Sequence, residues 1–194
     1  MPRFKIVNSE IKIGKEINDI DRFVLKTTDI LSKYTDYVIV SGYVAIFFGR
    51  SRGSEDVDIF IKGLSLEKFR EMFNDFVKNG FEFTIDDPDE LYKEYLKQET
   101  PVGVWEKDTP LLRLDMKFPK ELSQHQLLKD SIRVLFDGRT LWMANIESTI
   151  AYKEEIAKSE KDLLDARHLR LVFDNLDKQK IENYKKLFKQ EFYK

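Results

Sequence analysis

The chain lacks several residue types that define whole classes of functional site. It contains no cysteine, which excludes disulfides, thiolate metal sites and cysteine nucleophiles. With two histidines in 194 residues, a histidine-rich zinc site is not expected either. No segment approaches the run of about 20 apolar residues that spans a bilayer, and the N-terminal residues carry no continuous apolar stretch of the signal-peptide kind. These absences predict a soluble, cytoplasmic protein that does not associate with membranes.

An excess of charge of one sign is also missing. The 33 lysines and arginines nearly balance the 35 aspartates and glutamates, for a net charge of -2. This balance argues against broad, nonspecific binding of nucleic acid through a basic face, and it leaves a local basic groove open. Hydrophobic residues make up 42% of the chain, which at this length is enough to bury a core without disulfides or metals.

Strand and helix patterns alternate along the chain through residue 143, and helical patterns alone follow. The residues expected to be extended are 3–13, 37–40, 57–61, 81–85, 102–105, 111–118, 132–136 and 140–143, the last two joined at an Asp137-Gly138 turn. The residues expected to be helical are 16–34, 43–48, 65–78, 122–128, 146–158, 161–174 and 178–192, with a further helix start at 87–90. This order predicts an α+β fold, with a mixed sheet flanked by helices over 1–143 and a helical C-terminal part over 144–194 packed on it.

Two aspartates inside one apolar strand are the first candidate functional residues. Asp56 and Asp58 are flanked by Val57, Ile59 and Phe60, and side chains two residues apart in a strand share a face. Two carboxylates that point the same way repel each other unless a cation lies between them, and a hard divalent cation bound through oxygen is the common solution. The alternative is an exposed strand edge with two solvated acids. The pattern favours a metal site.

A third acidic residue, Asp115, lies in the apolar segment LLRLDMKF. Burying an unpaired carboxylate is costly, so we expect it to meet Asp56 and Asp58 from a neighbouring strand. The alternative is a strand residue paired with Arg113 or Lys117, and we expect neither of them to pair well with it. Three carboxylates can hold two Mg²⁺ ions, with Mn²⁺ as the alternative metal, and such a pair activates an attacking oxygen and stabilises a leaving one. Transfer of a phosphoryl or nucleotidyl group depends on this charge neutralisation.

The Ser41-Gly42 step is a candidate phosphate site. It follows an apolar strand and opens a short predicted helix. Glycine permits close approach of the backbone, and a helix N-terminus offers free N–H groups to a phosphate. Ser41 or Ser54 would add a hydroxyl contact, and Arg50 and Arg52 lie close enough in sequence to the aspartates to reach the same phosphates. An ordinary strand-to-helix turn beside solvated arginines is the alternative.

Residues 41–61, read together as SGYVAIFFGRSRGSEDVDIFI, resemble the signature of the DNA polymerase beta-type nucleotidyltransferase superfamily. That signature is a Gly-Gly or Gly-Ser step after a strand, a short helix, an Asp-x-Asp or Asp-x-Glu pair in a strand, and a third acid on a later strand. The sequence departs from it at Ser41, where glycine is usual, and at Tyr43, where a small residue is usual. The resemblance implies a nucleoside triphosphate as substrate, ATP among the candidates, and Mg²⁺ as cofactor.

A narrower resemblance concerns one branch of that superfamily. The order Arg-x-Arg-x-Ser-x-Asp-x-Asp is similar to small prokaryotic members that include nucleotidyltransferase toxins of abortive-infection toxin–antitoxin systems. The later segment AYKEEIAKSEKDLLDARHL is similar to a helix lysine and a Lys-Asp-x-x-Asp element of the same branch. By this likeness Lys153 would contact the triphosphate, and Asp162 or Asp165 would lie near the active-site opening. The residues alone leave a solvated lysine open, and they favour a solvated acidic face paired with Lys161 or Arg167.

The function predicted from these motifs is a metal-dependent nucleotidyltransferase that moves a nucleoside monophosphate from an NTP to a hydroxyl and releases pyrophosphate. The predicted catalytic and metal-binding residues are Asp56, Asp58 and Asp115, and the predicted nucleotide-binding residues are Ser41, Gly42, Arg52, Ser54 and Lys153. The acceptor stays open between an RNA 3′ end, with tRNA implied by the family, a protein side chain and a small molecule such as an aminoglycoside. A toxin role would imply an antitoxin protein as partner. The alternatives are a non-catalytic nucleotide- or partner-binding module of the same fold, and a structural protein whose acids are incidental.

Overall fold

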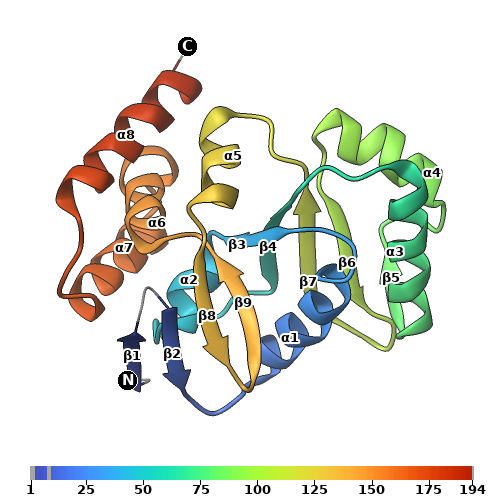
Figure 1. The fold of residues 1–194 in the computed structure, drawn as a ribbon, viewed down its shortest axis with the longest axis horizontal. Coiled ribbons are helices and arrows are strands. Elements are labelled where there is room, and N and C mark those ends of the chain that lie inside the picture. Colours follow the sequence, from blue (N-terminus) through green and yellow to red (C-terminus); the bar gives the residue numbers. More distant parts are fainter. Residues whose placement is uncertain (1–2, 8–9, 194) are drawn as a thin grey trace.

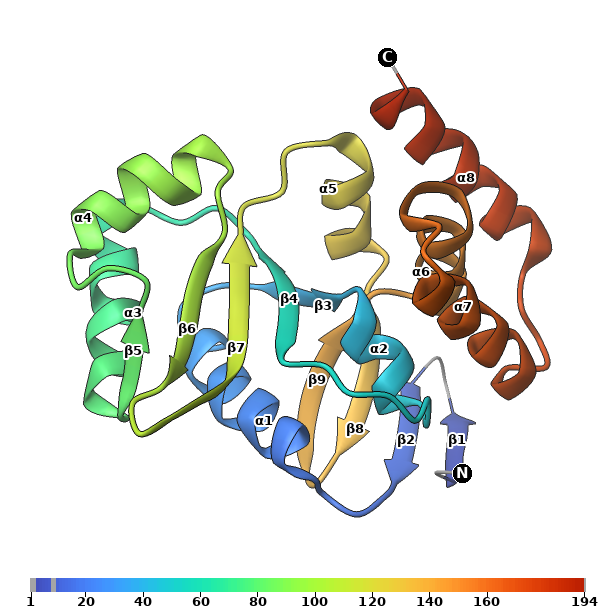
Figure 2. The same ribbon diagram turned by 180° about the vertical axis from the view of Figure 1, so that it is seen from behind.

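One mixed β-sheet forms the centre of the protein. The computed structural model describes residues 3–7 and 10–193, and nine strands in this part of the chain are joined in the order β1-β2-β8-β9-β3-β4-β7-β6-β5. Helices α6, α7 and α8 gather at one end of the sheet, and α3 and α4 lie at the opposite end (Figure 1). The view from behind shows the same separation, with α2 near the middle (Figure 2).

The observed order of strands and helices is close to the predicted order. The strands are β1 (Arg3–Val7), β2 (Glu10–Gly14), β3 (Tyr37–Val40), β4 (Asp56–Ile61), β5 (Phe81–Phe83), β6 (Val102–Glu106), β7 (Thr109–Lys117), β8 (Ile132–Phe136) and β9 (Arg139–Met143). The helices are α1 (Asp19–Leu31), α2 (Gly42–Phe47), α3 (Leu66–Lys78), α4 (Pro88–Glu90), α5 (Leu122–Lys129), α6 (Ile146–Tyr152), α7 (Glu160–Val172) and α8 (Lys178–Phe192). Short π- and 3₁₀-helical segments are η1 (Leu91–Tyr95), η2 (Leu96–Gln98) and η3 (Lys153–Ala157).

The α+β prediction is confirmed, since strands and helices mix as far as β9 and helices alone follow it. The segment expected to be extended over 3–13 is two strands, β1 and β2, that pair antiparallel, and its residues 8–9 lie outside the described part of the chain. Side chains of the last three helices, Ile150, Leu169 and Phe188 among them, belong to the same hydrophobic cluster as those of the sheet. The division of the chain after residue 143 into two parts stays a prediction.

Local side-chain hydrogen bonds fix where several elements begin and turn. The Asn18 side chain accepts from the Asp21 N–H at 2.9 Å, and the Asp21 carboxylate accepts from the Asn18 N–H at 3.2 Å, which forms a capping box at the start of α1. The helices α3, α6, α7 and α8 are capped by Ser65, Asn145, Ser159 and Asp177. Both residues of the Asp137-Gly138 turn have positive φ, 49° and 71°, as a tight hairpin between β8 and β9 requires.

Asp21 is a fully buried charged residue at the start of α1. Its Oδ1 accepts from Lys15 Nζ at 2.7 Å and from the Tyr43 hydroxyl at 2.8 Å. Burial, together with the Asp21 charge, holds the pKa of the Tyr43 hydroxyl well above its ordinary value, so this group stays a hydrogen-bond donor. The Tyr43 ring is fully buried and lies 5.8 Å from the ring of Phe47. The large residue that replaces the expected small one after Gly42 is therefore packed into the core.

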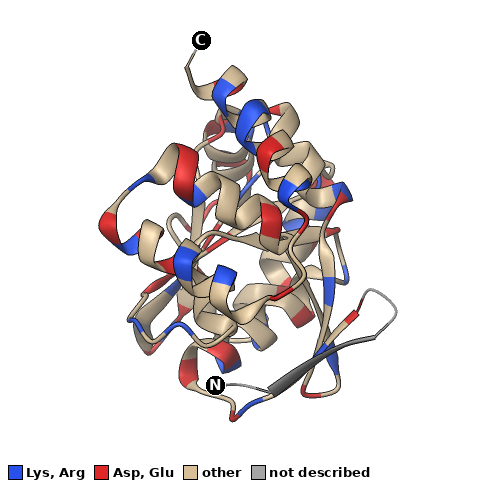
Figure 3. Ribbon diagram, turned by 90° about the vertical axis from the view of Figure 1, so that its left-hand side faces the viewer, with Lys and Arg blue, Asp and Glu red and all other residues tan. Residues whose placement is uncertain are grey.

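Charged residues of both signs are interspersed over the surface. Figure 3 shows lysine, arginine, aspartate and glutamate positions alternating along the helices on one side of the molecule. Within the described residues, every helix is too short or too polar to cross a membrane.

Replacing Tyr43 with phenylalanine tests the buried contact with Asp21. The Tyr43→Phe variant removes one hydrogen bond to a buried charge and leaves Lys15 and the Asn18 N–H as its partners, so we expect a loss of about 2 kcal/mol of unfolding free energy. Urea unfolding measures the change. Tyr193→Phe is the matched control, because the Tyr193 side chain is largely exposed; equal losses in the two variants would show that the buried contact has no special weight.

Candidate functional site

Strand register brings two of the predicted carboxylates side by side. Val40, at the end of β3, pairs with Asp58 of β4, and Asp58 pairs on its other side with Asp115 of β7. Paired residues on neighbouring strands share a face, so the two carboxylates are neighbours on the sheet. The Ser41-Gly42 turn begins directly after Val40. Three strands thus place the candidate metal ligands and the candidate phosphate turn at one point.

The environment of Asp58 opposes its negative charge. The side chain is half-buried, and burial raises the pKa of its carboxyl above the ordinary value of 3.8. A hydrogen bond from Ser41 and the charge of Lys117 lower this pKa, whereas the negative charges of Asp115 and Asp56 raise it. A carboxylate that is desolvated and flanked by like charges is stabilised when a cation binds to it.

Asp115 has a partner that the sequence analysis did not expect. Arg113 Nε donates to Asp115 Oδ1 at 2.6 Å, so the prediction that Arg113 would pair poorly with Asp115 was wrong. Residues two apart in a strand point to the same face, which lets the arginine reach the carboxylate. The guanidinium of Arg113 lies against Gly103 of β6, the residue that pairs with Asp115. A Cβ at position 103 would clash with this guanidinium.

The donor set suits a hard divalent cation, although its side chains are not gathered around one point. Asp58 and Asp115 offer carboxylate oxygens from adjacent strands, which is the ligand type that Mg²⁺ prefers. Asp56 begins β4 and is exposed. Within residues 3–7 and 10–193, no three acidic or histidine side chains lie close enough together to hold a metal ion. Of the three predicted ligands, Asp58 and Asp115 lie on adjacent strands, and Arg113 holds one carboxylate oxygen of Asp115.

The backbone at Ser41 adopts a conformation that strongly favours glycine. Ser41 has φ 64° and ψ -136°, which explains why glycine is usual at this position in the superfamily that the motif resembles. Gly42 is buried, and a Cβ at this position would clash with the guanidinium of Arg52. Glycine does permit a close approach at Gly42, as predicted, but in this structure the approaching group is the guanidinium of Arg52.

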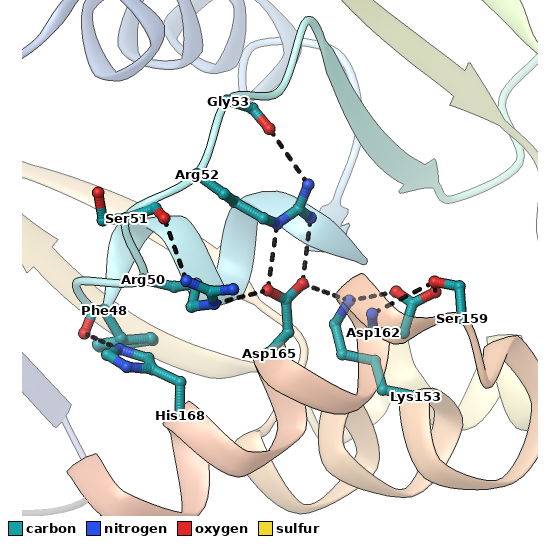
Figure 4. A network of polar contacts seen from close by, with 10 residues as sticks. All are labelled: Phe48, Arg50, Ser51, Arg52, Gly53, Lys153, Ser159, Asp162, Asp165 and His168. Carbon is teal, nitrogen blue, oxygen red and sulfur yellow. Dashed lines mark hydrogen bonds and ion pairs between the residues drawn. The ribbon is translucent and has the colours of Figure 1, made fainter.

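The buried carboxylate of Asp165 collects the basic side chains around this turn (Figure 4). Its Oδ1 accepts from Arg52 Nε at 3.1 Å, and its Oδ2 lies 3.1 Å from Arg52 Nη2. Lys153 Nζ donates to Asp165 Oδ2 at 2.9 Å and to Asp162 Oδ1 at 2.8 Å. Arg50 Nε lies 3.5 Å from Asp165 Oδ1. The loop before β4 is thereby joined to η3 and α7.

This network corrects the interpretation of α7 as a solvated acidic face. Asp165 is fully buried and Lys153 is 1% exposed, so neither is a surface residue, and Asp165 pairs with cations from other elements. The alternative of a solvated Arg52 does not describe this side chain either, since its guanidinium lies against Gly42 and Asp165. Three cationic side chains face two carboxylates, which leaves the network with one positive charge in excess beside the Ser41-Gly42 turn.

Ser54 and Asp56 lie at the open edge of the site. The Ser54 hydroxyl donates to the backbone carbonyl of Asp56 at 3.1 Å, so it stabilises the loop at the start of β4. Neither residue lines the cavity described next.

A cavity of about 230 Å³ opens beside Asp58. Its lining includes Ser41, Asp58 and Lys153 from the predicted set, and it extends between α5, α6 and α8. The sequence analysis did not identify several other lining residues whose side chains could contact a ligand. These include Lys117, Ser123, Gln124, Tyr152 and Phe192. Lys117 could have been found, because it follows Asp115 by two residues in one strand. The others come together only when the helices pack, and no local pattern signals that.

Comparison with solved structures identifies the type of fold. The solution structure of ANT(2'')-Ia, an antibiotic-resistance factor with substrate-regulated conformation dynamics, aligns with a TM-score of 0.52 at 12% identity, over 89% of this chain and 95% of its own. An antigenic nucleotidyltransferase-like protein from Paracoccidioides brasiliensis aligns with a TM-score of 0.48 at 14% identity, over 87% and 86%. No protein-family model and no curated protein sequence matches this chain. The likeness to the first structure supports the predicted nucleotidyltransferase-like fold.

Removing the charge of Asp58 should stabilise the ligand-free protein. Because the pKa of Asp58 is higher in the folded chain than its ordinary value, the stability that this group contributes is present in acid and is lost as pH rises through the folded pKa. Asp58→Asn abolishes that loss, so we expect a gain of about 1 kcal/mol near pH 7 that shrinks toward pH 4. Thermal unfolding across this range measures it. Asp56→Asn, at an exposed position, should change stability by less than about 0.5 kcal/mol; a matching gain there would disprove the assignment to burial.

Neutralising Asp165 should have the opposite effect. In Asp165→Asn, Arg50, Arg52 and Lys153 keep their charges but lose their shared buried partner, and we expect unfolding free energy to fall by about 3–5 kcal/mol. Asp162→Asn is the control, because its side chain is partly exposed and contacts one of the three cations. A urea titration in which both variants lose similar, small amounts would contradict the central role of Asp165.

Proposed function

We propose that the protein is a metal-dependent nucleotidyltransferase, which moves a nucleoside monophosphate from an NTP to a hydroxyl group and releases pyrophosphate. The observation that carries this proposal is the register of β3, β4 and β7. It aligns the Ser41-Gly42 turn, Asp58 and Asp115 on neighbouring strands. Phosphoryl-type transfer depends mainly on positioning and on neutralising charge, and this is the chemistry that such a group of residues can supply.

The triphosphate would lie at the start of α2. Ser41 offers its hydroxyl there, and Gly42 leaves room for a phosphate once Arg52 shifts from the space above it. The network around Asp165 supports this placement, because its excess positive charge lies beside the turn. Arg52 and Lys153 would then be shared between Asp165 and the phosphates, as charge-assisted hydrogen bonds allow.

The carboxylates would hold Mg²⁺, with Mn²⁺ as the alternative, and Asp56, Asp58 and Asp115 are the residues proposed as its ligands. Two such ions, when bound, neutralise the phosphates and lower the pKa of the attacking hydroxyl. The acceptor oxygen forms a bond to the α-phosphorus while the bond from that phosphorus to the bridging oxygen breaks. Pyrophosphate leaves with the electron pair, and Asp115, freed from Arg113, accepts the hydroxyl proton.

The acceptor class and a biological role are narrower parts of the proposal. An RNA 3′ end, tRNA included, a protein side chain and a small molecule are the acceptors under consideration. The toxin role, with an antitoxin protein as partner, rests on the sequence motif alone. The chain also resembles in fold an antibiotic-resistance factor, which keeps a small-molecule acceptor among the candidates.

One observation favours a second candidate, a nucleotide-binding module without turnover. Arg113 occupies the Asp115 carboxylate at 2.6 Å, and Arg52 occupies the space above Gly42. If these contacts persist with nucleotide bound, the protein would bind an NTP without assembling the metal centre. The two candidates differ in whether a labelled nucleotide reaches an acceptor.

Nucleotide binding and transfer test the proposal directly. We expect calorimetry to show Mg²⁺-dependent binding of at least one of ATP, GTP, CTP and UTP, abolished by EDTA. With α-labelled NTPs and cellular RNA, protein and small-molecule fractions, label should enter one fraction, and Asp58→Asn should slow that transfer by at least about a hundredfold.

The controls separate folding from chemistry. Asp58→Asn is expected to be more stable than the wild type, so lost activity there cannot come from unfolding. Asp19→Asn removes a carboxylate that is 95% exposed on α1 and should transfer normally. Binding without any labelled product would favour the non-catalytic module, and binding that needs neither metal nor Asp58 would overturn the proposed site.

A further inference from the structure

The lining of the cavity beside Asp58 combines two chemically different groups of side chains. Ser41, Asp58 and Lys153 are polar and belong to the candidate triphosphate site. Tyr152, Phe188 and Phe192 are aromatic, and we call them the aromatic wall. The volume, about 230 Å³, is below the roughly 300–1,000 Å³ of pockets that enclose whole drug-sized ligands. It suits one part of a substrate whose remainder lies outside the cavity.

The aromatic wall offers a stacking surface. The Tyr152 ring lies 5.4 Å from the ring of Phe188 and 6.1 Å from that of Phe192, both edge-on. Phe188 is buried behind, whereas Phe192 remains 46% exposed. Stacking of a planar ring on a solvent-exposed aromatic side chain that lines a cavity is favourable.

The cavity lining also includes a buried polar atom without a hydrogen-bond partner among the described residues, the hydroxyl oxygen of Ser123. Ser123 at the start of α5 is fully buried and lines the cavity, and its Oγ makes no hydrogen bond with any described residue. Its backbone N–H donates to Glu191 Oε1 at 2.9 Å, which fixes α5 against α8. A buried hydroxyl without a partner is costly, and this one can both donate to and accept from the edge of a ligand.

The charged residues that line the cavity indicate whether it would hold a cationic acceptor or an uncharged ring. Among the lining residues that the structure describes, Asp58 is the single acid, and Lys117 and Lys153 are the bases. A polycationic acceptor would meet more positive than negative charge here. An uncharged planar ring with polar edges would meet the aromatic wall on its face and Ser123 on its edge.

We propose that this cavity holds the base of the nucleoside triphosphate, with Phe192 and Tyr152 against its face and Ser123 bonded to its edge. The inference rests on the proposed function, because it takes the triphosphate to lie at Ser41 and Gly42. It adds a site for the base and names the residues that would decide which NTP is used.

Comparing NTPs with inorganic tripolyphosphate separates the base site from the phosphate site. By calorimetry with Mg²⁺, we expect the wild type to bind its preferred NTP more tightly than tripolyphosphate. Phe192→Ala should weaken NTP binding about tenfold, the size of one lost stacking contact, and leave tripolyphosphate binding unchanged. Ser123→Ala should reduce the preference among the four NTPs. Tyr193→Ala is the matched control, since Tyr193 is a neighbouring exposed aromatic outside the cavity.

Each other outcome overturns one idea and not the other. Equal affinity for NTP and tripolyphosphate, or an equal loss of both in Phe192→Ala, would overturn the base site and leave the proposed function standing. Binding of neomycin that Phe192→Ala abolishes, with NTP binding intact, would make the cavity an acceptor site and overturn the inference. If neither phosphate compound binds, the proposed function fails. NMR with the four nucleosides then decides the cavity: shifts at its lining residues that Phe192→Ala removes would support it, and no shifts would overturn it.

Discussion

The buried carboxylate of Asp165 is the interaction on which the geometry of the site depends. It receives Arg52 from the loop before β4 and Lys153 from η3, with Arg50 close by. Buried charges need a partner because desolvation opposes them, so these cations are held wherever the carboxylate is. The position of Asp165 therefore fixes the loop that leads to Asp56. It also fixes the helical turn next to Tyr152, which lines the cavity.

The change from α- to π-helical geometry at Lys153 serves the same site. Tyr152 ends α6 and Lys153 begins η3, and both line one cavity although they are consecutive in the chain. Residues adjacent in a regular helix point about 100° apart, and π-helical turns are frequent at functional sites. Here an aromatic ring and a cation from successive residues line the same cavity at this change of helix geometry.

The sequence predicted the parts of this site that follow from strand geometry. Asp58 and Asp115 were expected to meet on neighbouring strands, and the pairing of β4 with β7 places them side by side. The failures came where a partner arrives from elsewhere in the fold. Asp165 was interpreted as solvated because nothing near it in sequence marks it as buried, and Ser123 and Phe192 are brought together by the packing of α5 against α8. The pairing of Arg113 with Asp115 was predictable and was missed.

Strain at Ser41 shows a related limit of sequence patterns. The residue departs from the glycine of the motif, and the structure retains the backbone conformation that glycine would adopt freely. The retained hydroxyl lies where it hydrogen-bonds Asp58. A departure from the motif that looks unfavourable in sequence therefore brings a polar group to the carboxylate.

The order of strands in the sheet also constrains how fast the protein can reach this structure. The β8–β9 hairpin is inserted between β2 and β3, so each of these strands pairs with a partner roughly a hundred residues away. Such pairings must close long loops, at a cost in entropy, before the strand contacts stabilise the chain. This slows folding relative to proteins built on local contacts. The hairpin at Asp137-Gly138 can form early and alone, but β3, on which the Ser41-Gly42 turn depends, acquires both of its neighbours only when the distant hairpin docks. Completion of the sheet beside the Ser41-Gly42 turn therefore depends on a long-range pairing.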